Sequence, residues 1–283
     1  VLATRRQAAK ANRVAGVGYV HEHSDRPGAS LALAEEGIAT TIFAEVLSIG
    51  RDPDVVWTAA LERDLPLAPH ALHTVHAELL RRIAQSGKMC SIHVAESPAE
   101  RELFATGTGP LSELVSGFAL PTGTTPVEYA LSLGLGRPGV QWVHVCEVAE
   151  GEWDRIAAAG VSIAHCPRSN AALACRPFDL RRVLDAGIPV GLGLDSQASS
   201  GPVSMVEEMA AALAASPVTA EEVWNLATEG GAKSLGLEGW SIEVGHRVPL
   251  IAFPFASLNE IIHNRPAPTW VLGPFRDFTI ISV

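Results

Sequence analysis

Residues 160–199 read GVSIAHCPRSNAALACRPFDLRRVLDAGIPVGLGLDSQAS and hold the clearest indication of the fold. This stretch contains two short apolar runs, Val161–Ala164 and Pro189–Leu194, which lead into His165 and Asp195. The segment between the runs has apolar residues at helical spacing and a glycine where a helix would end. The stretch therefore predicts strand, helix, strand, with a chemically capable side chain where each strand ends.

The same alternation of strands and helices extends over most of the chain and is typical of a parallel sheet covered by helices. The expected strands are 17–20, 40–46, 65–69, 89–94, 140–145, 161–165 and 189–194. We therefore predict an α/β fold, a TIM-like (β/α) barrel with seven of its eight strands present. Because the chain opens with a helical pattern that ought to follow a strand, we expect the first strand to lie upstream, in a longer protein. An open doubly wound sheet is the alternative, but no GxGxxG or P-loop motif supports it.

The pattern changes after Leu237, where short alternating segments are broken by glycine and proline. We predict a barrel domain over residues 1–237 and a small C-terminal β segment over 238–283. The stretch PFASLNEIIHNRPAP, residues 254–268, is expected to be irregular.

Composition excludes several classes of function. Hydrophobic residues make up 47% of the chain and charged residues 18%, which favours a folded core over disorder. The formal charge of −10 argues against nucleic-acid binding, and no apolar run approaches the roughly 18 residues of a membrane span. The four cysteines show no CxxC pair or disulfide-framework spacing. These features predict a cytoplasmic protein that acts on a small molecule, without nucleic-acid or membrane partners.

Ionisable side chains gather at the same end of the expected strands. Five strands contribute them: His70, His93 with Glu96, His144, His165 and Asp195. A single histidine at a strand end is usually structural, but five strands that agree are hard to dismiss. Histidine and carboxylate that converge on one barrel mouth indicate a hydrolytic metal site in which the ion acidifies a bound water.

Four motifs occur in a fixed order: PHALHTV (69–75), IHVAES (92–97), AHCPRSN (164–170) and GLGLDSQAS (191–199). Together they resemble the amidohydrolase superfamily, in particular the branch of chlorohydrolases and of adenosine-like, guanine and aminodeoxyfutalosine deaminases. The resemblance covers most of residues 2–235. It implies that residues 1–237 form a metal-dependent hydrolase barrel and that 238–283 form the C-terminal part of a composite β-sandwich built from both chain ends.

The resemblance also implies catalytic roles. His93 and Asp195 match metal ligands of the fifth and eighth family strands. Glu96 matches the acid/base that carries protons between water, ring nitrogen and leaving group, and His144 matches the histidine that hydrogen-bonds the metal-bound hydroxide. Asp195 can also accept the proton of the water, so the catalytic set is Glu96, His144 and Asp195.

The implied substrate is heteroaromatic. His70 matches a residue that contacts substrate, while His165 and Asn170 belong to a motif that shapes the pocket. The expected reaction is hydrolytic deamination of an aminopurine nucleoside-like or related substrate, with one divalent metal, Zn²⁺ in preference to Fe²⁺. A homodimer is compatible with the family. Leu72 and His73 stand where relatives commonly have proline and tyrosine, so the pocket is expected to differ.

The first-strand HxH pair that this branch uses as further ligands has no clear counterpart. The only HxH is His21-Glu22-His23, which falls where the family has its second strand. We interpret it as a coincidental pair on the surface or in the pocket, so that this chain holds part of a metal site. Three alternatives stay open: chlorohydrolase-type dehalogenation, a non-catalytic barrel, and a metal-free barrel enzyme such as an isomerase, for which a phosphate site is only weakly supported.

Overall fold

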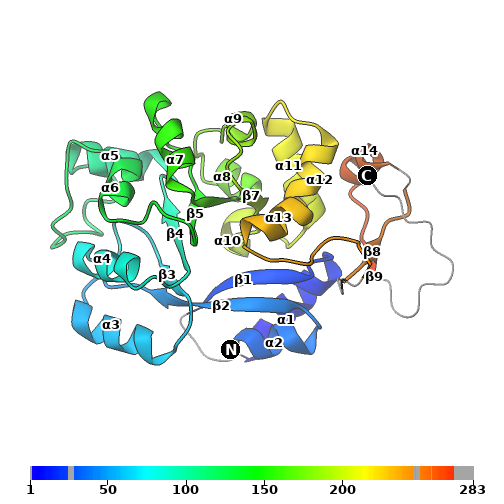
Figure 1. The fold of residues 1–283 in the computed structure, drawn as a ribbon, viewed down its shortest axis with the longest axis horizontal. Coiled ribbons are helices and arrows are strands. Elements are labelled where there is room, and N and C mark those ends of the chain that lie inside the picture. The colour runs from blue at the N-terminus through cyan, green and yellow to red at the C-terminus, as the bar shows by residue number, and fades with distance from the viewer. Residues whose placement is uncertain (1, 25–28, 245, 247–248, 256, 271–283) are drawn as a thin grey trace.

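The computed structural model describes residues 2–24, 29–244, 246, 249–255 and 257–270. Within these residues, seven parallel strands pair in chain order, so that β1 and β7 form the two edges of one curled sheet (Figure 1). The strands are Tyr19–Ser24 (β1), Ala39–Val46 (β2), Leu67–Pro69 (β3), Cys90–Val94 (β4), Val140–His144 (β5), Ser162–His165 (β6) and Val190–Leu192 (β7). This architecture confirms the predicted TIM-like barrel class.

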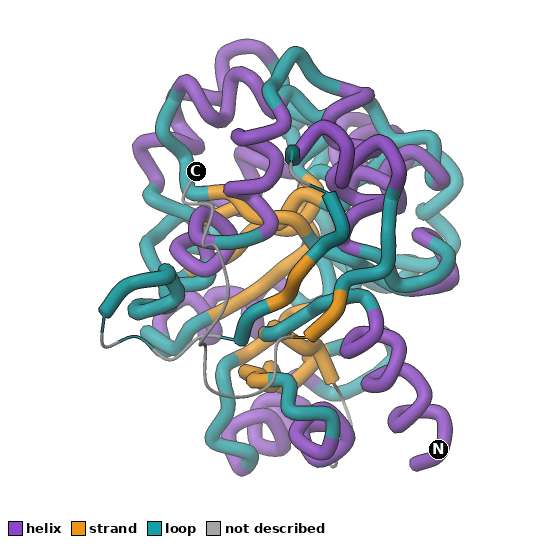
Figure 2. The backbone as a smooth tube through the Cα atoms, turned by 90° about the vertical axis from the view of Figure 1, so that its right-hand side faces the viewer, coloured by secondary structure: helices purple, strands orange, loops and turns teal. Residues whose placement is uncertain are grey.

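Helices lie outside the strands (Figure 2). Those before β5 are Leu2–Val14 (α1), Ala29–Glu35 (α2), Pro53–Glu62 (α3), Ala77–Gln85 (α4), Pro98–Thr106 (α5) and Pro126–Ser132 (α6). Those after β5 are Trp153–Ala159 (α7), Pro167–Ala172 (α8), Leu180–Asp185 (α9), Gln197–Ser200 (α10), Met205–Ala215 (α11), Ala220–Ala227 (α12), Glu229–Ser234 (α13) and Leu258–Asn264 (α14), with a short 3₁₀ turn at Glu150–Glu152. No helix in the described ranges is long and apolar enough to cross a membrane.

The first strand differs from the prediction. It was expected over 17–20, ahead of the histidine pair, whereas β1 runs from Tyr19 to Ser24 and contains both His21 and His23. The reason is pairing: β2 is long enough to match all six residues of β1 in parallel register, from Tyr19 with Ala39 to Ser24 with Ala44. Backbone hydrogen bonds therefore extend the strand beyond its apolar run. The other expected strands agree closely with β2–β7.

Glycine at position 191 lets the last strand pack closely against α13. A methyl group there would lie 2.7 Å from Ser234 Oγ and 3.0 Å from the Cα of Gly231. These contacts are shorter than van der Waals separation, so a larger residue would push α13 off the sheet. The GLGLD run thus combines a close helix contact with the strand end that carries Asp195.

The C-terminal segment holds two short strands and a helix. Ile251–Ala252 (β8) pairs antiparallel with Thr269–Trp270 (β9), in line with the predicted small β segment. The expectation of irregular chain between them is wrong over α14, which Ser257 caps by accepting a hydrogen bond from the backbone of Glu260. Residues 271–283 lie outside the described residues, and the composite sandwich stays a prediction.

The core between sheet and helices sets the stability of the barrel, and Leu80 on α4 lies within it, fully buried. We expect Leu80→Ala to lower the free energy of unfolding by about 2–5 kcal/mol, because it removes buried apolar contacts and leaves a cavity. Urea denaturation measures the change. Leu31→Ala on α2 is the matched control, since Leu31 is 65% exposed and its truncation should change stability little. Equal effects would contradict the placement of this core.

Candidate metal centre

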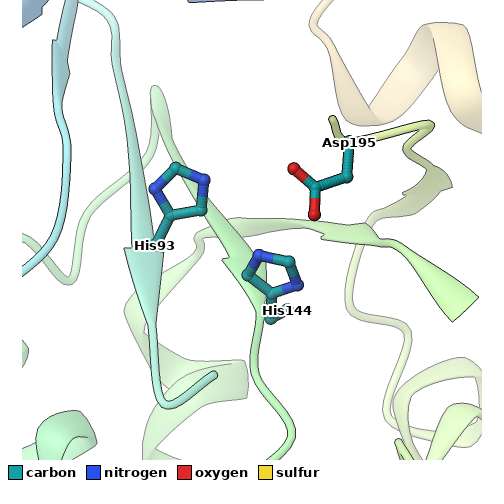
Figure 3. Close-up of side chains that lie close together, drawn as sticks. All are labelled: His93, His144 and Asp195. Atoms are coloured by element: carbon teal, nitrogen blue, oxygen red, sulfur yellow. The ribbon is translucent and has the colours of Figure 1, made fainter. Parts of the chain in front are cut away.

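Three ionisable side chains meet where β4, β5 and β7 end (Figure 3). His93 lies in β4, His144 closes β5, and Asp195 lies just beyond β7. One ligand atom from each is within 4.8 Å of the other two. His144 and Asp195 have φ values of 72° and 52°, in the left-handed region that residues other than glycine seldom adopt. The chain turns sharply at both exits, as backbone often does at functional sites.

Both imidazoles are oriented through their Nδ1 atoms. His93 Nδ1 is hydrogen-bonded to the backbone carbonyl oxygen of His70. His144 Nδ1 is 2.7 Å from Asn170 Oδ1, which can only accept, so this nitrogen carries the proton. In each ring, Nε2 is then left as the nitrogen with a lone pair. This is the arrangement by which metal-binding histidines are fixed in one tautomer.

Hydrogen bonds also orient the carboxylate. The hydroxyl of Ser169 donates to Asp195 Oδ2, and the hydroxyl of Ser199 donates to the same oxygen at 3.2 Å. Burial alone would raise the pKa of Asp195, but the Ser169 hydrogen bond and the nearby His144 hold that pKa below its usual value. Asp195 is therefore an anion at neutral pH. Neither serine was among the residues selected from the sequence, although Ser169 lies inside the AHCPRSN motif and Ser199 ends the GLGLDSQAS motif.

This donor set suits a divalent metal ion. Two imidazole nitrogens and an ionised carboxylate are the ligand types that Zn²⁺ and related ions take in proteins. The outer hydrogen bonds from His70, Asn170 and Ser169 supply the supporting contacts that such sites require. The residues present thus fit a divalent metal ion, as the sequence predicted.

Glu96 stands beside the three side chains. Its Oε1 is 3.3 Å from His144 Nε2, and its side chain is 27% exposed. Ser97 follows it as the N-cap of α5 and accepts a hydrogen bond from the backbone of Glu100. A carboxylate in this position borders both solvent and the candidate metal centre, as a group that moves protons must.

The residues predicted to bind substrate occupy two environments. The His70 ring lies 5.2 Å from that of His93, centroid to centroid, and its Nδ1 is 2.9 Å from Thr74 Oγ1. His165 is buried and stacked on Phe178, and burial lowers its pKa to about 3. Asn170 is likewise buried, against His144. Substrate contact by these three residues stays a prediction.

The HxH pair faces the interior of the barrel. The His23 ring lies 5.8 Å from the His93 ring, and the His21 ring lies 4.8 Å from that of Phe43. Burial lowers the pKa of His23 to about 3 and that of His21 to about 4. From the sequence, we interpret this pair as lying on the surface or in the pocket. The surface position is therefore wrong. Neither histidine belongs to the compact three-residue cluster found among the described residues.

Asn170 offers a test of the outer contacts. We expect Asn170→Ala to lower the turnover of the metal-loaded protein by about 10–100-fold, because His144 loses the acceptor that fixes its ring. Steady-state product release measures the change. Asn12→Ala on α1 is the control, since Asn12 bonds only within its own helix, to the carbonyl oxygen of Ala8 at 3.0 Å. An Asn170→Ala protein with unaltered turnover would show that this hydrogen bond does not support the centre.

The chain is similar to proteins of one family. The sequence profile of the amidohydrolase family matches residues 65–275. The chain is 36% identical over 207 residues to an aminodeoxyfutalosine deaminase of Deinococcus radiodurans, covering 62% of this chain and 49% of that protein. It is 30% identical over 261 residues to a 5-methylthioadenosine/S-adenosylhomocysteine deaminase of Natronomonas pharaonis, covering 83% and 57%. The chain thus spans about half the length of the curated relatives it matches.

A solved structure shares the fold. The crystal structure of Helicobacter pylori aminofutalosine deaminase aligns with a TM-score of 0.82 at 22% sequence identity. The alignment covers 96% of this chain and 77% of that one. At this level of identity the likeness supports the barrel architecture and leaves the chemistry to the residues of the site.

Proposed function

The chain belongs to the amidohydrolase family, and from that premise we propose that it forms the barrel of a metal-dependent hydrolase that deaminates an adenosine-like or related heteroaromatic substrate. One observation carries the proposal. His93, His144 and Asp195 each place a ligand atom within 4.8 Å of the others. Glu96 Oε1 lies 3.3 Å from His144 Nε2. Hydrolysis at an aromatic carbon needs an activated water and a mobile proton, and this arrangement has a group for each.

His93 and Asp195 would hold the ion, which we take to be Zn²⁺. When bound, it supplies Lewis-acid chemistry that lowers the pKa of water and makes it a nucleophile near neutral pH. His144 borders the same space, and its Nε2 would hydrogen-bond the attacking water. Asp195, kept anionic by its Ser169 hydrogen bond, would accept the proton that the water gives up.

Glu96 would carry protons. In deamination, the water oxygen adds to the carbon that bears the amino group, and a ring nitrogen next to that carbon is protonated. The carbon–nitrogen bond then breaks as the leaving amine takes up a proton, which yields ammonia and an oxo-substituted ring. A carboxylate beside His144 with partial solvent access can serve both transfers.

We infer the substrate class from the residues of the site together with the names of the similar proteins. The relatives bear the names of deaminases of aminodeoxyfutalosine and of 5-methylthioadenosine/S-adenosylhomocysteine, which supports an adenosine-like substrate for this chain. His70 lies against the metal centre, and we propose that it contacts the ring. We propose that His165 and Asn170 shape the pocket from behind, since both are buried.

Three finer points belong to the same proposal. Cys90, Cys146, Cys166 and Cys175 are all unpaired, which supports a reducing compartment such as the cytoplasm. We propose that residues 238–283 complete the barrel as part of a composite β-sandwich. A homodimer is compatible with the expected family behaviour.

A substrate panel tests the proposal. The metal-loaded protein is incubated with adenosine, 5′-methylthioadenosine and a chlorotriazine, and ammonium and chloride are measured. We expect ammonium and the matching oxo-purine in equal amounts from an adenosine-type substrate, and none from Asp195→Ala. Release of chloride from the triazine without release of ammonium would show that the protein catalyses dehalogenation and not deamination. Neither product from protein that holds one equivalent of metal would contradict a catalytic barrel.

A further inference from the structure

Glu100 is a buried carboxyl group that the proposed chemistry does not use. It lies in the first turn of α5, and only 1% of its surface is exposed. Its Oε2 accepts a hydrogen bond at 2.8 Å from the backbone N–H of Glu96. Carboxyl groups are seldom buried to this extent without a partner of opposite charge, so this one calls for a function.

The hydrogen bond completes a clamp on a single peptide unit. The carbonyl oxygen of Ala95 accepts the backbone N–H groups of Cys146 and Glu147, each at 2.8 Å. Glu100 holds the other side of the same unit, the N–H of Glu96. Ala95 has a φ of 53°, a left-handed conformation that needs outside support in a residue other than glycine. The clamp therefore fixes the turn from which the Glu96 side chain extends toward His144.

The second oxygen of Glu100 points to His73. Glu100 Oε1 and His73 Nδ1 lie 3.9 Å apart, and neither has a hydrogen-bond partner among the described residues. Burial raises the pKa of Glu100 to about 8 and lowers that of His73 to about 4. Near neutral pH the carboxyl group is therefore protonated and the imidazole is neutral. Glu100 Oε1 thus faces the unpartnered Nδ1 of His73, while Oε2 accepts a hydrogen bond from the backbone N–H of Glu96.

We propose that Glu100 is a positioning residue for the Glu96 acid/base, with His73 lying beside its far oxygen. The inference rests on the proposed role of Glu96. It assigns a function to His73, which the proposed chemistry does not use, and it links the loop after β3 to the loop after β4. His70 lies in the loop after β3. The proposed substrate contact His70 and the proposed proton carrier Glu96 therefore lie in loops that the Glu100 side chain connects.

Four variants separate this role from simple packing. Glu100→Gln keeps one acceptor and one donor in the same shape, as a protonated carboxyl has. Glu100→Leu keeps the volume and removes both. Glu102→Leu is the matched control, because Glu102 is an exposed glutamate on the same helix. His73→Phe tests the far oxygen independently, should Glu100→Leu fail to fold.

The first readout is amide hydrogen exchange at Glu96, followed by NMR, together with the chemical shift of His144 Nε2. Glu100→Leu should speed exchange at Glu96 by at least about tenfold and move the His144 signal, His73→Phe should do so to a smaller degree, and Glu100→Gln and Glu102→Leu should match the parent. Unchanged exchange in Glu100→Leu and His73→Phe, or an effect of Glu100→Gln as large as that of Glu100→Leu, would overturn the proposal.

The second readout is kinetic. In a parent that releases ammonium, Glu100→Leu should lower kcat by about 10–100-fold with KM nearly unchanged and metal content intact, and Glu100→Gln should restore most of kcat. A loss shared equally by kcat, metal content and stability would mark Glu100 as structural and overturn the proposal. Should the parent release no ammonium, the deaminase proposal fails, while exchange and chemical shift still decide the role of Glu100.

Discussion

Glu96→Gln is expected to lower turnover by about 10²–10⁴-fold while the protein keeps its metal. The amide has nearly the shape of the carboxylate, and its N–H can donate a hydrogen bond to His144 Nε2, but it cannot take up and release a proton. The distance of 3.3 Å between Glu96 Oε1 and His144 Nε2 places this group where proton transfer is needed. Steady-state ammonium release and metal analysis on the same preparation measure the two effects.

Glu102→Gln is the matched control for this substitution, because it makes the same chemical change at an exposed position of the neighbouring helix. It should keep parental turnover. A Glu96→Gln protein that turns over at the parental rate would exclude Glu96 as the proton carrier. Loss of metal in the same variant would instead make Glu96 part of the metal centre.

His93→Ala is expected to abolish stoichiometric metal binding, with a loss of affinity greater than the 10–100-fold or so that removal of an outer contact costs. His93 contributes one of the two imidazoles of the cluster, and its Nδ1 is already committed to the carbonyl oxygen of His70. Dialysis against trace metal followed by elemental analysis measures the bound ion.

His263→Ala serves as the control, since His263 is an exposed histidine on α14. It should bind metal as the parent does. Full metal occupancy in His93→Ala would show that the ion sits elsewhere, and the interior pair His21 and His23 would then be the first residues to examine.

The fold and the outline of the site could be predicted from the sequence because both depend on patterns within short segments of the chain. Apolar runs that end in histidine or aspartate marked strand exits, and in a parallel barrel all such exits meet at one face. His93, His144 and Asp195 were therefore found without knowledge of how the strands pair. The helix before β7 and the glycine that ends it could likewise be predicted from the local sequence.

Other features depend on contacts that no local pattern encodes. The HxH pair was expected outside a strand because its residues are polar, yet pairing with β2 carries β1 through His23. Ser169 is a partner of Asp195 because α8 packs beside α10, which begins just after Asp195. Glu100 resembled an ordinary acidic residue in a first helical turn until its burial against Glu96 was known.

The most direct measurement is the position of the bound ion. Crystals of the zinc-loaded protein, recorded on both sides of the zinc absorption edge, yield an anomalous difference peak that marks the metal. We predict one peak about 2.0–2.2 Å from His93 Nε2 and from a carboxylate oxygen of Asp195, beside His144. A fully occupied zinc peak bound to neither His93 nor Asp195 would contradict a metal centre at the mouth of this barrel.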